Sequence, residues 1–162
     1  MKNLLVAIIP LSFLFSCGTH DDSEVMRLAT EFAGNTIDSA LVFTDGDGVV
    51  TMGDTRARYV INPAQIFRGR LHEHSGNSIW VTIDSLHDPY LVPLYHLVLS
   101  EKKGELGIQN SIRSDMRVLA ITRGKITAEI PTHLPESPLY YCSECRDTVQ
   151  FLFSGGKLVR VD

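Results

Sequence analysis

The chain has 162 residues, and its 15 lysines and arginines against 19 aspartates and glutamates give a formal net charge of −4 at pH 7. A mildly acidic chain has no overall electrostatic reason to bind nucleic acid, so we expect no nucleic-acid partner. Its length suits one domain, which can bury roughly two-thirds of its unfolded surface without help from metal ions or disulfides.

The first residues have the order of a secretory signal peptide. Lys2 is followed by an apolar run over residues 4–15 and then by the small-residue sequence Ser16-Cys17-Gly18. This order of a positive residue, an apolar run and a small-residue cleavage region is typical of secreted proteins. The run contains Pro10 and falls well short of the about 20 residues that a membrane-spanning helix needs. The sequence therefore predicts a cleaved signal and no transmembrane helix here.

Leu14-Phe15-Ser16-Cys17 resembles the lipobox of bacterial lipoproteins, although Phe15 is bulkier than the small residue common at its position in that motif. The resemblance covers residues 1–23. It implies that residues 1–16 are removed and that Cys17 becomes the lipid-carrying first residue. Lipoproteins of this family carry several acyl chains on that residue, which implies stable anchoring because a single chain binds a membrane only marginally.

The residues after Cys17 suggest where in the cell the protein is located. Gly18 follows the cysteine, and Asp21-Asp22 resembles the acidic export signal of Bacteroidota surface lipoproteins. This resemblance implies a lipid anchor in the outer membrane, with the domain either periplasmic or surface-exposed. We expect residues 17–23 to form the lipidated cysteine and a polar spacer, and residues 24–162 to form a single β-rich domain.

The first expected element is a short helix over residues 24–33. Val25, Leu28, Ala29 and Phe32 recur at helical spacing in this stretch. Ser23 is its expected N-cap and Gly34 its expected end.

After this helix the apolar residues recur with a period of two, which predicts strands. Arg123-Gly124 and Gly155-Gly156 are expected hairpin turns. The pattern favours an all-β or β-rich α+β fold, an antiparallel sandwich or small barrel with one short N-terminal helix. The expected strands are residues 56–61, 66–74, 79–85, 94–99, 116–122, 125–130, 151–154 and 157–161.

The strand over residues 79–85 carries the only tryptophan, Trp80. Ile79, Val81 and Ile83 form the cleaner apolar face. If that face is buried, Trp80, Thr82 and Asp84 point outward, and an exposed tryptophan favours contact with a glycan or a partner.

Cys142 and Cys145 have C-x-x-C spacing. Too little chain follows Cys145 for a thioredoxin fold, and Arg146 stands where covalent haem needs histidine. In a compartment that permits disulfides, a local disulfide is the favoured interpretation. The alternatives are half of a zinc site completed by His133, or by His72 with His74, and a pair of redox-responsive thiols. Apart from this alternative we expect no metal and no cofactor.

Basic residues alternate along two expected strands. Arg68, Arg70, His72 and His74 share one face of residues 66–74, and Arg56 and Arg58 share one face of residues 56–61. If the strands pair, these groups gather into a site for an anion or an acidic glycan. The competing interpretation is an ordinary solvated face.

The sequence contains no common catalytic or nucleotide-binding motif. We therefore expect a lipid-anchored envelope protein with a non-catalytic binding role, not an enzyme, and with a glycan or an envelope protein as partner. The alternatives are a hydrolase or inhibitor whose site is assembled from distant loops, and a structural subunit of an outer-membrane assembly.

The lipid anchor is testable in cells grown with labelled palmitate. We expect label on the wild-type chain and none on a Cys17→Ala variant, because only Cys17 stands at the lipobox position. A Cys142→Ala variant controls for unrelated loss of cysteine and should remain labelled. Label that persists on Cys17→Ala would contradict the anchor.

Overall fold

The computed structural model describes residues 21–37, 42–45, 47–53, 58–71, 76–87, 90–140, 142 and 144–161. The expected signal segment with Cys17 lies outside the described residues, as do Arg56, His72 and His74. In chain order the described elements are α1 (Asp22–Ile37), β1 (Val42–Thr44), β2 (Val50–Gly53), β3 (Arg58–Gly69), β4 (Ser78–His87), β5 (Tyr90–Lys102), β6 (Glu105–Arg113), β7 (Arg117–Thr122), β8 (Lys125–Pro131), β9 (Arg146–Ser154) and β10 (Lys157–Arg160).

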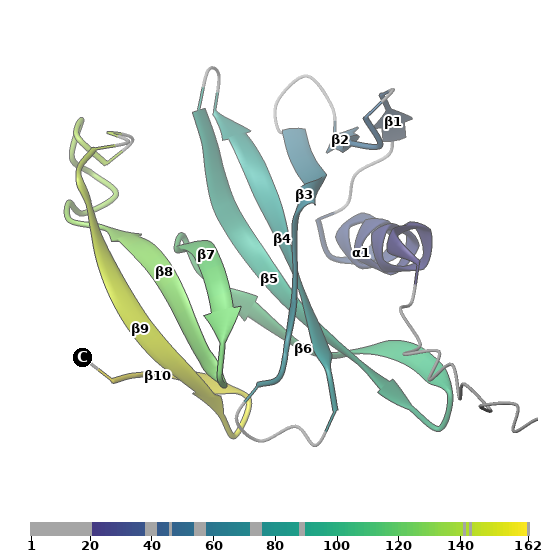
Figure 1. The fold of residues 1–162 in the computed structure, drawn as a ribbon. Coiled ribbons are helices and arrows are strands. Elements are labelled where there is room, and N and C mark those ends of the chain that lie inside the picture. Colours follow the sequence, from purple (N-terminus) through teal and green to yellow (C-terminus); the bar gives the residue numbers. More distant parts are fainter. Residues whose placement is uncertain are drawn as a thin grey trace, which may run out of the picture.

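The strands form two antiparallel sheets, with the orders β1-β2-β3-β4-β5-β6 and β10-β9-β8-β7. The sheets meet where Leu71, just after β3, bridges to Gly124, and where the Asn110 side-chain amide donates to the Gly156 carbonyl at 2.8 Å. Figure 1 shows them spreading apart from there toward the β4–β5 hairpin and the β8–β9 connection. The prediction of a β-rich antiparallel fold with one N-terminal helix is confirmed.

Strand β4 is buried on both faces. Ile79, Val81 and Ile83 pack with α1 residues such as Val25 and Ala29 in one core. The opposite face of β4 carries Trp80, which packs with residues of the smaller sheet in a second core. Trp80 is 0% exposed, and Thr82 and Asp84 are also buried. The outward orientation predicted for these three residues is therefore wrong, because a second sheet covers the face that alternation alone assigned to solvent.

Helix α1 is longer than its pattern predicted. It begins at Asp22 rather than Glu24, so the last two residues of the expected spacer, Asp22 and Ser23, belong to the helix. Asp21, not Ser23, caps it: its carboxylate accepts from the Ser23 backbone N–H at 3.4 Å and from the Ser23 hydroxyl at 2.7 Å. These bonds lower the pKa of Asp21. Gly34 does not end the helix, which continues to Ile37. The helix packs against the larger sheet on both sides of Gly34 in sequence.

Residues 56–61 and 66–74 were predicted to be separate strands, but residues 58–61 and 66–69 all belong to the single strand β3. The pairing with β4 shifts between Ile61 and Ile66. Pro63, which has no N–H for the ladder, lies within this irregularity. The Asn62 side chain also accepts from the Ala64 backbone N–H at 2.9 Å. A break in the hydrogen-bond ladder was therefore mistaken for the end of a strand.

Both predicted hairpin turns are present. Arg123 and Gly124 join β7 to β8 with φ of 52° and 80°, and Gly155 and Gly156 join β9 to β10 with φ of 56° and 74°. Positive φ at both central residues is the backbone that a tight two-residue hairpin requires.

Gly69, the last residue of β3, lies against the smaller sheet. A Cβ added there would stand 2.7 Å from Ile121 Cγ2 and 3.2 Å from the Ile121 carbonyl oxygen. We expect Gly69→Ala to lower the free energy of unfolding by about 1–3 kcal/mol through overpacking, measured by urea denaturation. Gly76→Ala is the control, because its Cβ would meet nothing within 4 Å. Equal stability of the two variants would contradict the close approach of β3 to β7.

Candidate functional site

A cleft of about 460 Å³ opens where the two sheets spread apart. Its walls come from the ends of β4 and β5, from the connection between β6 and β7, and from the connection between β8 and β9. The lining residues are Ser85, Val92, Pro93, Leu94, Arg113, Ser114, Asp115, Pro135 and Tyr140. A concave site with mixed apolar and polar lining is the first place to look for ligand binding.

The β6–β7 connection carries the chain from one sheet to the other and forms the polar wall. The Ser114 backbone N–H donates to the Leu94 carbonyl at 3.2 Å, which ties this connection to β5. The Ser114 hydroxyl accepts from the Met116 backbone N–H at 3.2 Å and so supports the turn into β7. These bonds place Arg113 and Asp115 on the cleft wall.

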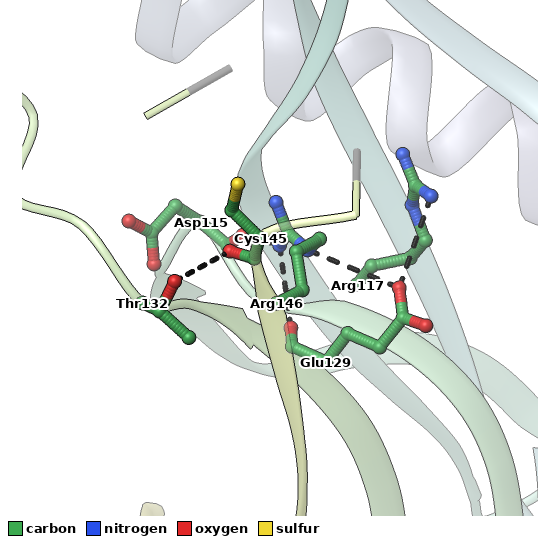
Figure 2. Close-up of polar contacts among 6 residues, drawn as sticks. All are labelled: Asp115, Arg117, Glu129, Thr132, Cys145 and Arg146. Atoms are coloured by element: carbon green, nitrogen blue, oxygen red, sulfur yellow. Dashed lines mark hydrogen bonds and ion pairs between the residues drawn. The ribbon is translucent and has the colours of Figure 1, made fainter. Parts of the chain in front are cut away.

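Arg146 at the start of β9 holds this wall to the smaller sheet (Figure 2). Its guanidinium donates to the carbonyl of Asp115 at 2.7 Å and to the carbonyl of Glu129 at 3.3 Å. The Glu129 carboxylate lies 3.9 Å from Arg146 Nε and 3.8 Å from Arg117 Nη1. Burial, and next the positive charge of Arg117, lower the pKa of Arg146, while Glu129 acts in the opposite direction.

The β8–β9 connection forms the facing wall. The Tyr140 hydroxyl donates to Asp115 Oδ2 at 2.5 Å, which joins the two walls. Cys142 and Cys145 form a disulfide with Cα atoms 5.2 Å apart. Thr132 donates to the Cys145 carbonyl from both its backbone N–H and its hydroxyl, each at 3.0 Å, and so closes the base of the segment. In the structure, the C-x-x-C pair therefore lies in the same connection as Pro135 and Tyr140, which line the cleft.

Beneath the cleft, His96 is buried between the sheets. Its Nδ1 accepts from the Trp80 indole N–H at 3.2 Å and lies 3.1 Å from the Thr82 hydroxyl. Burial lowers the pKa of His96 to about 4, although the nearby backbone of Met116 and Ser114 opposes this. Among the described residues, His96 Nε2 has no hydrogen-bond partner. Because an indole N–H only donates, Nδ1 is the unprotonated nitrogen, and the neutral ring carries its proton on Nε2.

Asp84 is the second perturbed group in the interior. It is 1% exposed, and among the described residues its Oδ2 has no hydrogen-bond partner. Burial raises the pKa of Asp84 to about 6, and a hydrogen bond from the Gln65 side chain and the charge of Arg117 act against that rise. Asp84 precedes Ser85, a lining residue, but its own carboxyl is shielded from the cleft.

The structure does not bring the predicted basic residues together on one face of the sheet. Arg58 and Arg68 lie at opposite ends of β3. Arg58 pairs with Leu86, while Arg68 pairs with Ile79, and these β4 residues lie on opposite faces. The register shift in β3 thus moves Arg68 to the α1 side, where its guanidinium contacts the Asp22 carboxylate at 2.5 Å.

The remaining predicted residues are placed as follows. Arg70 is exposed just after β3, and Arg56, His72 and His74 lie outside the described residues. His133 lies in the β8–β9 connection. Within the described ranges, no group of three or more His, Cys, Asp or Glu side chains could hold a metal ion.

Sequence reasoning missed Arg113, Asp115 and Tyr140 as site residues. The available signals were the polar Ser114-Asp115 pair directly after an alternating stretch, and the position of Tyr140 two residues before Cys142. Neither signal says that the two segments meet, because they come together only through the packing of the two sheets.

Comparison of this chain with protein-family models, with curated proteins and with solved structures found no match. Among the helices that the structure describes, none is long and apolar enough to cross a membrane.

The two buried groups, Asp84 and His96, make the free energy of unfolding depend on pH in opposite directions. The pKa of Asp84 is raised from 3.8 to about 6 on folding. The stabilisation that Asp84 contributes to the folded state is therefore full below pH 4 and is lost as pH rises through 6. The pKa of His96 is lowered from 6.5 to about 4. Its contribution is therefore full above pH 6.5 and is lost as pH falls through 4. We expect the two slopes to offset each other in the wild type.

Asp84→Asn removes one of these slopes. Relative to wild type, the variant should gain up to about 3 kcal/mol of unfolding free energy between pH 4 and pH 8, because wild type must bury a charge at high pH. Urea denaturation at several pH values measures this difference. Thr148→Val, at an exposed position in β9, exchanges two side chains that do not titrate and should therefore differ from wild type by a constant amount. A constant difference for Asp84→Asn as well would contradict the assignment.

Proposed function

We propose that the chain is a lipid-anchored protein of the bacterial outer membrane that binds a glycan, without catalysis, in the cleft between its two sheets. The observation that carries this proposal is the mixed lining of the cleft beside an exposed aromatic residue. Tyr90 is 50% exposed and lies two residues before the lining residue Val92, on the same face of β5.

A sugar ring has apolar C–H faces and hydroxyl edges, and the cleft offers partners for both. Val92, Pro93 and Pro135 supply apolar surface. The Ser114 hydroxyl accepts from the Met116 backbone N–H and can donate its own hydrogen to a sugar hydroxyl. An amphipathic tyrosine at the mouth adds a surface on which a ring can stack.

Two observations support binding rather than catalysis. Asp84, whose raised pKa would suit a general acid, is 1% exposed and cannot contact a ligand in the cleft. Asp115, which does line the cleft, already accepts the Tyr140 hydroxyl. In the ligand-free protein, one of these two carboxyl groups is thus buried and the other is engaged in a hydrogen bond within the protein.

The placement of α1 fits an anchored protein. Three residues separate Cys17 from Asp21, so their Cα atoms can be at most about 14 Å apart in extended chain. Asp22 contacts Arg68, which pairs with Ile79 near the start of β4. Ser85 in the cleft lies six residues further along β4, about 20 Å away. This geometry supports a cleft held away from the bilayer, where it can meet an extended polymer.

Exposed apolar residues favour an envelope-protein partner as a second candidate. Leu134 is 75% exposed and Leu139 is 52% exposed, and each is adjacent in sequence to a lining residue. Apolar side chains gathered at the rim of a cleft are typical of a protein interface. A partner that covers the mouth would bury them.

The glycan hypothesis is testable with the full-length protein in detergent on a glycan array, followed by calorimetry with the best binder. We expect Tyr90→Ala to weaken binding about threefold to tenfold through lost stacking. Val159→Ala should leave affinity unchanged, because Val159 is also 50% exposed but lies on edge strand β10. Wild type that retains no glycan would overturn the proposal, as would full affinity in Tyr90→Ala.

A further inference from the structure

Arg113 is the cation of the cleft, and its side chain is unusual among the arginines near it. Arg117 and Arg146 both lie close to Glu129. Arg113, the last residue of β6, is exposed and lines the cleft. Within the part of the chain that the structure describes, its guanidinium has no carboxylate within salt-bridge distance and no side-chain hydrogen bond.

The other charged lining residue does not compensate Arg113. The Oδ2 atom of Asp115 accepts the Tyr140 hydroxyl, and the Asp115 carbonyl accepts from Arg146. The carboxylate of Asp115 thus holds the two walls together, whereas Arg113 is exposed and has no such partner among the described residues. A ligand that enters the cleft meets an uncommitted guanidinium on a wall that also offers the Ser114 hydroxyl.

We propose that the glycan bound in this cleft is an acidic sugar whose carboxylate pairs with Arg113. This inference rests on the proposed glycan-binding function and names its ligand class. A planar guanidinium matches a carboxylate with two parallel hydrogen bonds, which adds specificity as well as affinity. A singly charged group fits better than a phosphate dianion, because the nearby Asp115 carboxylate would repel the second negative charge.

The experiment compares an oligogalacturonate with its methyl ester, two ligands with the same sugar chain, of which only the acid carries charged carboxylates. Calorimetry uses the full-length protein in detergent at low ionic strength. We expect wild type to bind the acid at least tenfold more tightly than the ester, and to lose this preference as salt screens the charge. Arg113→Gln should bind the acid about tenfold more weakly and the ester as wild type does.

Arg70→Gln is the matched control. Arg70 is also exposed, but it lies beyond the Arg68 end of β3 and is absent from the cleft. It should bind both ligands as wild type does, and thermal melting should show both variants folded.

Equal binding of acid and ester by wild type would overturn this inference and leave the proposed function intact. Loss of acid binding in Arg70→Gln alone would overturn it in favour of the basic residues predicted from the sequence. Binding of neither ligand class, together with an empty glycan array, would overturn the proposed function itself.

Discussion

The double burial of β4 is the constraint on which the rest of the structure depends. One face of the strand is covered by α1 through Ile79, Val81 and Ile83. The other carries Trp80 and Thr82, which need a second apolar layer and also polar partners. His96, directly opposite Thr82 on β5, supplies the partner at its Nδ1 atom for the Trp80 indole. The smaller sheet supplies the layer, so the chain must cross from β6 to β7 to cover this face.

That crossing produces the cleft. The sheets touch where Leu71 meets Gly124, but beyond Thr82 the inner face of β4 turns polar at Asp84, and the sheets spread apart (Figure 1). Arg146 and Tyr140 then fix the crossing segment through the carbonyl and carboxylate of Asp115. Because these bonds use groups of the crossing segment itself, the cleft walls are already ordered without ligand, which lowers the entropic cost of binding.

The sequence predicted those features that depend on neighbouring residues. The period of two, the Arg123-Gly124 and Gly155-Gly156 turns and the amphipathic N-terminal helix were local patterns, and the structure contains each of them. The predictions from sequence failed where contacts between distant parts of the chain determine the structure. Alternation cannot tell a strand with one solvated face from one covered twice, so Trp80 was misplaced. A ladder irregularity reverses which face each later residue occupies, so Arg58 and Arg68 were wrongly grouped. Asp115 and Tyr140, 25 residues apart, meet only in the folded chain.

The central claim is that the function lies in the cleft rather than on the Arg68 and Arg70 end of the larger sheet. Backbone amide chemical shifts during titration with an acidic oligosaccharide test this claim most directly, because they report the bound region without any mutation. The account predicts shifts concentrated at residues 85, 92, 94, 113–115, 136, 137, 139 and 140. Shifts concentrated around residues 68–71 and the start of α1, with the cleft residues unmoved, would contradict it.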